Sequence, residues 1–158
     1  MRYTALAFPL LALPAAAGTH ATPAALATFL VSACIEGTSL NADAVAAAGF
    51  TASGDGSDYT SDDGLTLDIA ARDGFMSCEL VVPSVTEDGL GATALELAAA
   101  IGEAFDEAKT GSVEDGMLWT IPRGDTLVTE AALRLSETGD MIFTAATSEG
   151  EAMEQDSN

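Results

Sequence analysis

The chain has 158 residues, of which 25 are acidic and five are basic, so its formal net charge at pH 7 is −20. This length suits a single domain with one core. Such a negative field repels phosphate backbones and anionic headgroups, which argues against nucleic-acid and membrane-surface roles, whereas a basic protein or a divalent cation would be attracted.

Residues 1–17 have the order of parts of an export signal. Arg2 provides a basic start, Ala5–Leu13 is apolar, and Ala15–Ala17 is a small-residue cleavage site. The sequence therefore predicts a periplasmic or secreted protein. No later stretch reaches the roughly 20 uninterrupted apolar residues that a membrane span requires.

Two helices are predicted at the start of the mature chain. Thr22 is a suitable N-cap before Pro23, and apolar residues then repeat at helical spacing up to Gly37. A shorter helix is expected between an N-cap at Asn41 and a C-cap at Gly49.

A polar segment and a hairpin follow. Thr51–Gly64 is rich in Gly, Ser and Asp, which predicts a surface loop. The pattern then alternates, and a two-residue turn at Asp73 and Gly74 would pair Leu65–Arg72 with Phe75–Val82 so that every second pair is apolar on both strands.

The second half of the chain predicts a long helix and a meander. Thr93 and Glu96 form a capping box, and Lys109 and Gly111 are typical of a helix end. Three strands are expected after it, at Met117–Ile121, Thr126–Ser136 and Met141–Thr147. A four-residue loop would place Trp119 opposite Val128, and core packing is expected for this tryptophan.

These elements predict an α+β fold: a single domain with two N-terminal helices, a β-hairpin, a long helix and a three-strand meander, forming one antiparallel sheet with helices on one face. The order resembles that of PAS-like and profilin-like domains, a resemblance that concerns architecture alone. The domain is expected to span residues 18–147, and residues 148–158 are expected to form an acidic disordered tail.

Cys34 and Cys78 are the two cysteines of the chain. An even count in an exported protein favours a single disulfide. Both residues lie on apolar faces of their predicted elements, so the pair is expected to join the first helix to the second hairpin strand.

The polar segment carries four aspartates, and carboxylate oxygens are the ligands that Ca²⁺ prefers. They are Asp55, Asp58, Asp62 and Asp63. Their spacing differs from that of an EF-hand. A calcium site and a solvated loop are therefore both compatible with this pattern, and no other cofactor is indicated.

Two further patterns concern exposed charges. The hairpin register places Asp68 opposite Glu79, which is compatible with an acid/base pair or with a tolerated surface repulsion. Arg123, Gly124 and Asp125 fall at a predicted hairpin tip, where they would form either an adhesive tripeptide or an ordinary turn.

The leading functional hypothesis is an exported, non-enzymatic binding domain that presents an acidic surface to a protein partner of basic character. Glu96, Glu103 and Glu107 lie opposite the apolar stripe of the long helix and are its candidate contact residues. The first alternative is a calcium-binding module built on the four aspartates, and the second is a small carboxylate-based hydrolase. No catalytic residue is assigned, since the motifs of histidine- and nucleophile-based enzymes are missing from the sequence.

Overall fold

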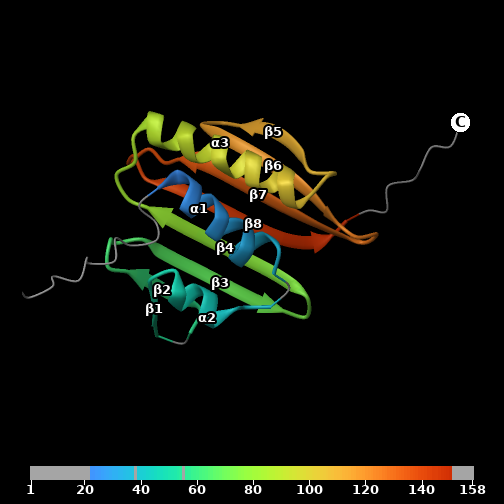
Figure 1. Ribbon diagram of the computed structural model, residues 1–158, viewed down its shortest axis with the longest axis horizontal. Helices are drawn as coiled ribbons and strands as arrows, with labels where there is room; N and C mark the ends of the chain where they lie inside the picture. The colour runs from blue at the N-terminus through green and yellow to red at the C-terminus, as the bar shows by residue number, and fades with distance from the viewer. Residues whose placement is uncertain (1–21, 38, 55, 151–158) are drawn as a thin grey trace, which may run out of the picture.

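The computed structural model describes residues 22–37, 39–54 and 56–150 (Figure 1). The predicted signal peptide and residues 151–158 lie outside these ranges. The helical elements are α1 (Pro23–Leu30), a π-helical segment η1 (Val31–Ile35), α2 (Ala42–Ala47) and α3 (Glu87–Ala104). The strands are β1 (Phe50–Ser53), β2 (Asp58–Ser61), β3 (Thr66–Arg72), β4 (Phe75–Val82), β5 (Lys109–Val113), β6 (Gly116–Arg123), β7 (Leu127–Leu135) and β8 (Met141–Glu149).

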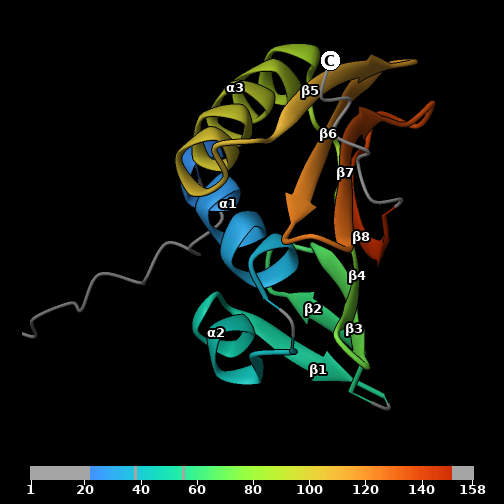
Figure 2. The same cartoon turned by 90° about the vertical axis from the view of Figure 1, so that its right-hand side faces the viewer.

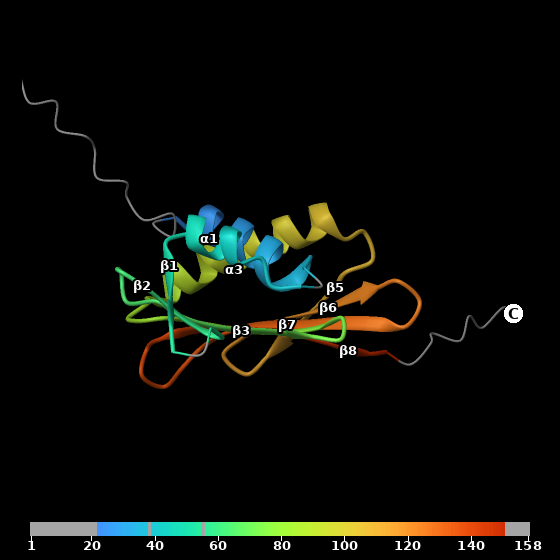
Figure 3. The same cartoon turned by 90° about the horizontal axis from the view of Figure 1, so that it is seen from below.

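The strands form one eight-stranded sheet in the order β1-β2-β3-β4-β8-β7-β6-β5, with every neighbouring pair antiparallel. Two successive meanders, each preceded by helix, therefore meet at the β4 and β8 pair in the centre. The described helices all lie on one face of the sheet (Figure 3). The predicted mixed fold with a single antiparallel sheet is confirmed, although several elements differ from the prediction.

Both N-terminal helices begin where the capping residues predict. The Thr22 side chain accepts a hydrogen bond from the backbone N–H of Ala25, and the Asn41 side chain accepts one from Ala44. Each cap satisfies a backbone donor that the first helical turn leaves unpaired. The first helix ends in η1, which brings Cys34 to the sheet.

The β3 and β4 hairpin has the predicted register. Asp73 and Gly74 have φ values of 54° and 86°, as a two-residue hairpin turn with both central residues in the left-handed region requires. Arg72 pairs with Phe75, and the pairing continues to Thr66 and Val81. Turn chemistry and side-chain alternation agree here, so this register buries one apolar face of the hairpin in the core, whereas Phe75 beside the turn is 37% exposed.

The prediction of a surface loop over Thr51–Gly64 is wrong, because most of this segment forms the β1 and β2 hairpin at one edge of the sheet. Tyr59 is buried on the helix side and pairs with Leu67. Strand β2 has Tyr59 as its one large apolar residue, so its sequence shows no alternation of apolar and polar residues. It is extended because β3 provides hydrogen-bond partners for its backbone.

The start of the long helix lies seven residues before the predicted capping box. Thr86 is the N-cap and accepts a hydrogen bond from the N–H of Gly89. Thr93 is buried inside α3, where its hydroxyl donates to the Gly89 carbonyl. Gly89 and Gly91 are poor helix formers, so helix propensity did not predict the first two turns of α3.

The helix also ends earlier than expected, at Ala104, and Phe105 is extended with φ −140°. Lys109 and Gly111, predicted to close the helix, lie in strand β5. The predicted three-strand meander is therefore a four-strand one. Asp115, with φ 57°, occupies the turn that leads from β5 into β6.

The predicted pairing of Trp119 with Val128 is wrong. Strand β6 continues through Pro122 and Arg123, so the turn begins two residues later than expected, and Trp119 pairs with Ala131. Trp119 is nevertheless a core residue, with 1% of its surface exposed. Strand β8 continues to Glu149, so residues 148 and 149 belong to the sheet and not to a tail.

The core lies between the sheet and the helices. Leu80, Phe143 and Leu97 are fully buried there. Cys34 and Cys78 form the predicted disulfide, with 5.6 Å between their Cα atoms, and it joins η1 to β4 at the centre of the sheet. The described helices cover this face of the sheet and leave the opposite face uncovered.

Candidate functional site

One side of the sheet faces away from the helices (Figures 2 and 3) and is here called the open face. Alternate residues of each strand belong to it. In β3, for example, Leu67 and Ile69 are buried against the helices, whereas Asp68 is exposed. Successive side chains of a strand point to opposite faces, so Asp68 belongs to the open face.

Three carboxylates lie in one row across the open face. Asp58 on β2 pairs with Asp68 on β3, and Asp68 pairs in turn with Glu79 on β4. Residues directly opposite each other have Cβ atoms about 4.5–5.5 Å apart, and like charges at that separation destabilise the sheet. We call these three residues the acidic row. The sequence predicted the Asp68 and Glu79 pair, and strand β2 adds Asp58.

Among the described residues, no basic side chain forms an ion pair with the acidic row. Within residues 22–37, 39–54 and 56–150, the single ion pair joins Arg72 and Asp73 at the exposed hairpin turn, with 3.4 Å between nitrogen and oxygen. Because no ion pair among the described residues compensates this repulsion, three adjacent carboxylates are not explained by a contribution to stability.

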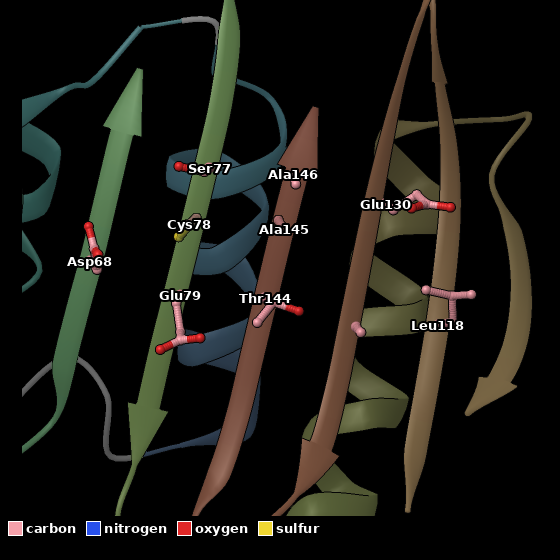
Figure 4. Close-up of a pocket in the computed structure, with 10 residues that line it drawn as sticks. Asp68, Ser77, Cys78, Glu79, Leu118, Glu130, Thr144, Ala145 and Ala146 are labelled. Atoms are coloured by element: carbon pink, nitrogen blue, oxygen red, sulfur yellow. The ribbon is translucent and has the colours of Figure 1, made fainter. Parts of the chain in front are cut away.

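Two residues of the acidic row, Asp68 and Glu79, border a hollow of about 510 Å³ on the open face (Figure 4). Asp68 and Glu79 lie on one side of it and Glu130 of β7 on the other. The lining between them consists largely of small side chains, with one larger apolar residue: Ser77, Ala132, Thr144, Ala146 and Leu118. Carboxylates around an uncharged floor suit the apolar stem and charged head of a lysine or arginine side chain.

The hollow also bears on the hydrolase hypothesis. Carboxylate-based glycoside hydrolysis needs two acids about 5–9.5 Å apart on opposite sides of the reacting bond. Asp68 and Glu79 instead lie beside each other on neighbouring strands, on an exposed surface. The hydrolase alternative therefore remains a prediction that rests on the large number of acidic residues in the sequence.

The structure separates the aspartates of the predicted calcium loop. Asp58 lies in the acidic row, whereas Asp62 and Asp63 lie beyond the other end of β2, about 13 Å along the strand at 3.3 Å per residue. Asp55 lies outside the described residues. In the described part of the chain, no group of three or more His, Cys, Asp or Glu side chains is placed to hold a metal ion.

The predicted acidic stripe on the long helix is incomplete. Glu96 and Glu103 are exposed on α3 and lie seven residues, or two turns, apart on one side of it. Glu107 follows the end of the helix, in the segment that leads to β5. The three residues therefore do not form one continuous helical surface.

The predicted tripeptide turn does not present its arginine. The Arg123 guanidinium donates hydrogen bonds to the backbone carbonyls of Ile35 and Glu36, and it lies 5.2 Å from the centre of the Phe105 ring. This contact joins the end of β6 to the end of η1. The Arg123 side chain is thus part of the packing, which excludes the adhesive interpretation in this conformation.

Repulsion within the acidic row predicts that removal of its central charge stabilises the fold. We expect Asp68→Asn to raise the free energy of unfolding by up to about 1 kcal/mol at low salt, because Asp68 has a carboxylate on each side. Urea unfolding measures this, and 1 M NaCl should remove most of the gain by screening. Glu137→Gln, an exposed change outside the sheet, is the matched control. An equal gain in both variants would show that net charge alone matters.

The sequence analysis assigned Asp58 to a calcium loop, and it did not single out Glu130. The neighbours of both residues in the sheet depend on strand pairing, and the period-two pattern around Glu130 is the one signal that places it on the open face. No protein-family model, curated protein or solved structure matches this chain.

Proposed function

We propose that this chain is an exported, non-enzymatic binding domain whose open face presents an acidic surface to a basic protein partner. The observation that carries the proposal is the acidic row, in which Asp58, Asp68 and Glu79 are aligned on three neighbouring strands and form no ion pair with any described residue. A destabilising arrangement that the fold does not need is explained when a cationic partner neutralises it.

The open face also offers apolar contact area. Val81, Ile142 and Leu118 are half-buried there. Val81 and Leu118 line hollows that Asp68 and Glu79 also line, and Ile142 pairs with Val81. Protein interfaces combine an apolar centre with a polar rim, and complementary charges raise the association rate more than the affinity. The open face therefore has the composition of a binding surface.

Export is supported by the signal pattern of residues 1–17 and is compatible with the disulfide between Cys34 and Cys78. None of the helices in the described ranges combines the length and apolarity that crossing a bilayer requires. The proposal places the domain outside the cytoplasm, where it meets its partner in solution.

The test compares two acidic surfaces of equal charge. The first variant carries Asp58→Asn, Asp68→Asn and Glu79→Gln, and the second carries Glu96→Gln, Glu103→Gln and Glu107→Gln. A partner captured from the native periplasm on the wild-type domain is purified, and its binding kinetics are measured with all three proteins. We expect the first variant to lower the association rate about tenfold at low salt and the second to lower it less than about twofold.

Two outcomes of the same experiment would contradict the proposed function. Equal losses in the two variants would mean that net charge, and not the open face, attracts the partner. A loss confined to the second variant would move the contact surface to α3 and the segment after it. Unfolding curves that show both variants to be at least as stable as the wild type establish that any loss is one of binding and not of folding.

A further inference from the structure

Strand β5 forms one edge of the sheet. It pairs with β6 on one side, and the described residues provide no strand on its other side. All five of its residues are exposed. An edge strand leaves backbone N–H and C=O groups unpaired, and proteins usually protect such edges with prolines, charges or bulges. Lys109 provides one charge at the start of β5, and Thr110–Ser112 carries none.

The other edge of the sheet is less accessible. Strand β1 has four residues, and α2 packs beside it (Figure 2). Its first residue, Phe50, is buried and stacks on Phe29 with 5.3 Å between ring centres. Of the two edges, β5 is therefore the better candidate for accepting another strand.

Carboxylates flank β5 at both ends. Asp106 and Glu107 precede it, and Glu114 and Asp115 follow it. All four are exposed, and none takes part in an ion pair within the described ranges. A strand of five residues is about 17 Å long. A segment lying along β5 would thus meet negative charge at both of its ends, which favours lysines or arginines there.

The middle of β5 has room for an apolar side chain. Gly111 pairs with the half-buried Leu118 on the open face, so no side chain of β5 stands beside Leu118 at that position. Val113, two residues on, shares this face and is 38% exposed. An added strand could cover both apolar residues with one apolar side chain at its centre.

We propose that the β5 edge binds an extended basic segment of another protein by strand addition, with an apolar residue at its centre and cationic residues at both ends. Backbone hydrogen bonds to β5 provide the affinity, and the four flanking carboxylates select the charge. A second copy of this chain fits poorly, because antiparallel pairing of two β5 strands would bring the flanking carboxylates of one copy against those of the other. The proposal is independent of the function proposed for the open face.

The test uses a synthetic peptide with two lysines at each end and the sequence Thr-Val-Ile-Val-Thr between them. Two further peptides carry N-methyl groups on alternate central residues, one set on the odd positions and one on the even positions. In a strand added at an edge, only alternate N–H groups of the peptide point toward that edge. We therefore expect one methylated peptide to lose at least about tenfold in affinity and the other less than about threefold.

A matched pair of protein variants locates the peptide. The edge variant carries Asp106→Asn, Glu107→Gln, Glu114→Gln and Asp115→Asn. The open-face variant carries Asp58→Asn, Asp68→Asn, Glu79→Gln and Glu130→Gln, which remove the same number of charges. We expect the edge variant to weaken binding about tenfold and the open-face variant less than about twofold, in 150 mM salt.

Hydrogen exchange provides the third measurement, because added backbone hydrogen bonds should slow amide exchange within Lys109–Val113 when the peptide is bound. Equal effects of the two methylation patterns would overturn the proposal, as would a larger loss in the open-face variant. A dimer of the free protein whose formation protects the same amides would also overturn it, since the edge would then belong to a second copy.

Discussion

Replacing Cys34 and Cys78 together with alanine is expected to lower the free energy of unfolding by about 4 kcal/mol, the largest effect of any change considered for this protein. The two residues are separated by 44 positions, and the chain-entropy model of loop closure gives this value for a loop of that size. Alanine is chosen because both positions are buried, where a serine hydroxyl would need a hydrogen-bond partner. Urea unfolding of the oxidised wild type and the double variant measures the difference.

Two controls separate the disulfide from the side chains. The wild type unfolded in the presence of a dithiol reductant should lose about the same free energy as the double variant. A thiol titration of the unreduced, denatured wild type should find no free cysteine. A loss below about 1 kcal/mol in both experiments would contradict the expectation, because it would mean that the bridge hardly restricts the unfolded chain.

The second large effect is expected for Arg123→Ala, which should lower the free energy of unfolding by about 2 kcal/mol. The change removes the hydrogen bonds to the Ile35 and Glu36 carbonyls and the contact with the Phe105 ring. A hydrogen bond with a charged donor contributes about 1.5–3 kcal/mol when buried, and solvent exposure of part of this contact reduces that value. Thermal or urea unfolding provides the measurement.

Arg134 offers the matched control, because it is an exposed arginine on the open face. Arg134→Ala should change the stability by less than about 0.5 kcal/mol. Arg123→Lys keeps the positive charge but loses the planar fork that reaches two carbonyls, so it should recover part of the loss and not all of it. If both alanine variants were equally stable, the Arg123 contact would have no structural role, and the tripeptide would again be free for other contacts.

Much of the local structure could be predicted because its causes lie within a few residues. Thr22 and Asn41 satisfy the first N–H groups of their helices, and Asp73 with Gly74 determines the register of a whole hairpin. The disulfide followed from the apolar faces that carry its two cysteines. For the caps and the turn, a neighbour in sequence supplies the interaction, so no knowledge of the rest of the fold is needed.

The elements that prediction missed are the short polar strands at the two edges of the sheet. Residues of β1, β2 and β5 are mostly exposed, so they lack the alternation that identifies a strand. Their conformation is determined by a neighbouring strand that offers backbone partners. The Trp119 register was predicted wrongly because the turn between β6 and β7 begins two residues later than expected, and moving a turn along the chain shifts every pair of its two strands.

The sequence by itself determined the export pattern, the extreme acidity, the α+β class and the β3 and β4 hairpin. Only the tertiary structure decided which carboxylates stand together. Asp58 lies beside Asp68 because β2 pairs with β3. Glu130 lies across the open-face hollow from Glu79 because β8 lies between β7 and β4. Glu107 leaves its predicted stripe because the helix ends first. The physical reason is that helix caps and turns act over three or four residues, whereas a binding surface on a sheet is assembled by strand pairs between residues distant in sequence.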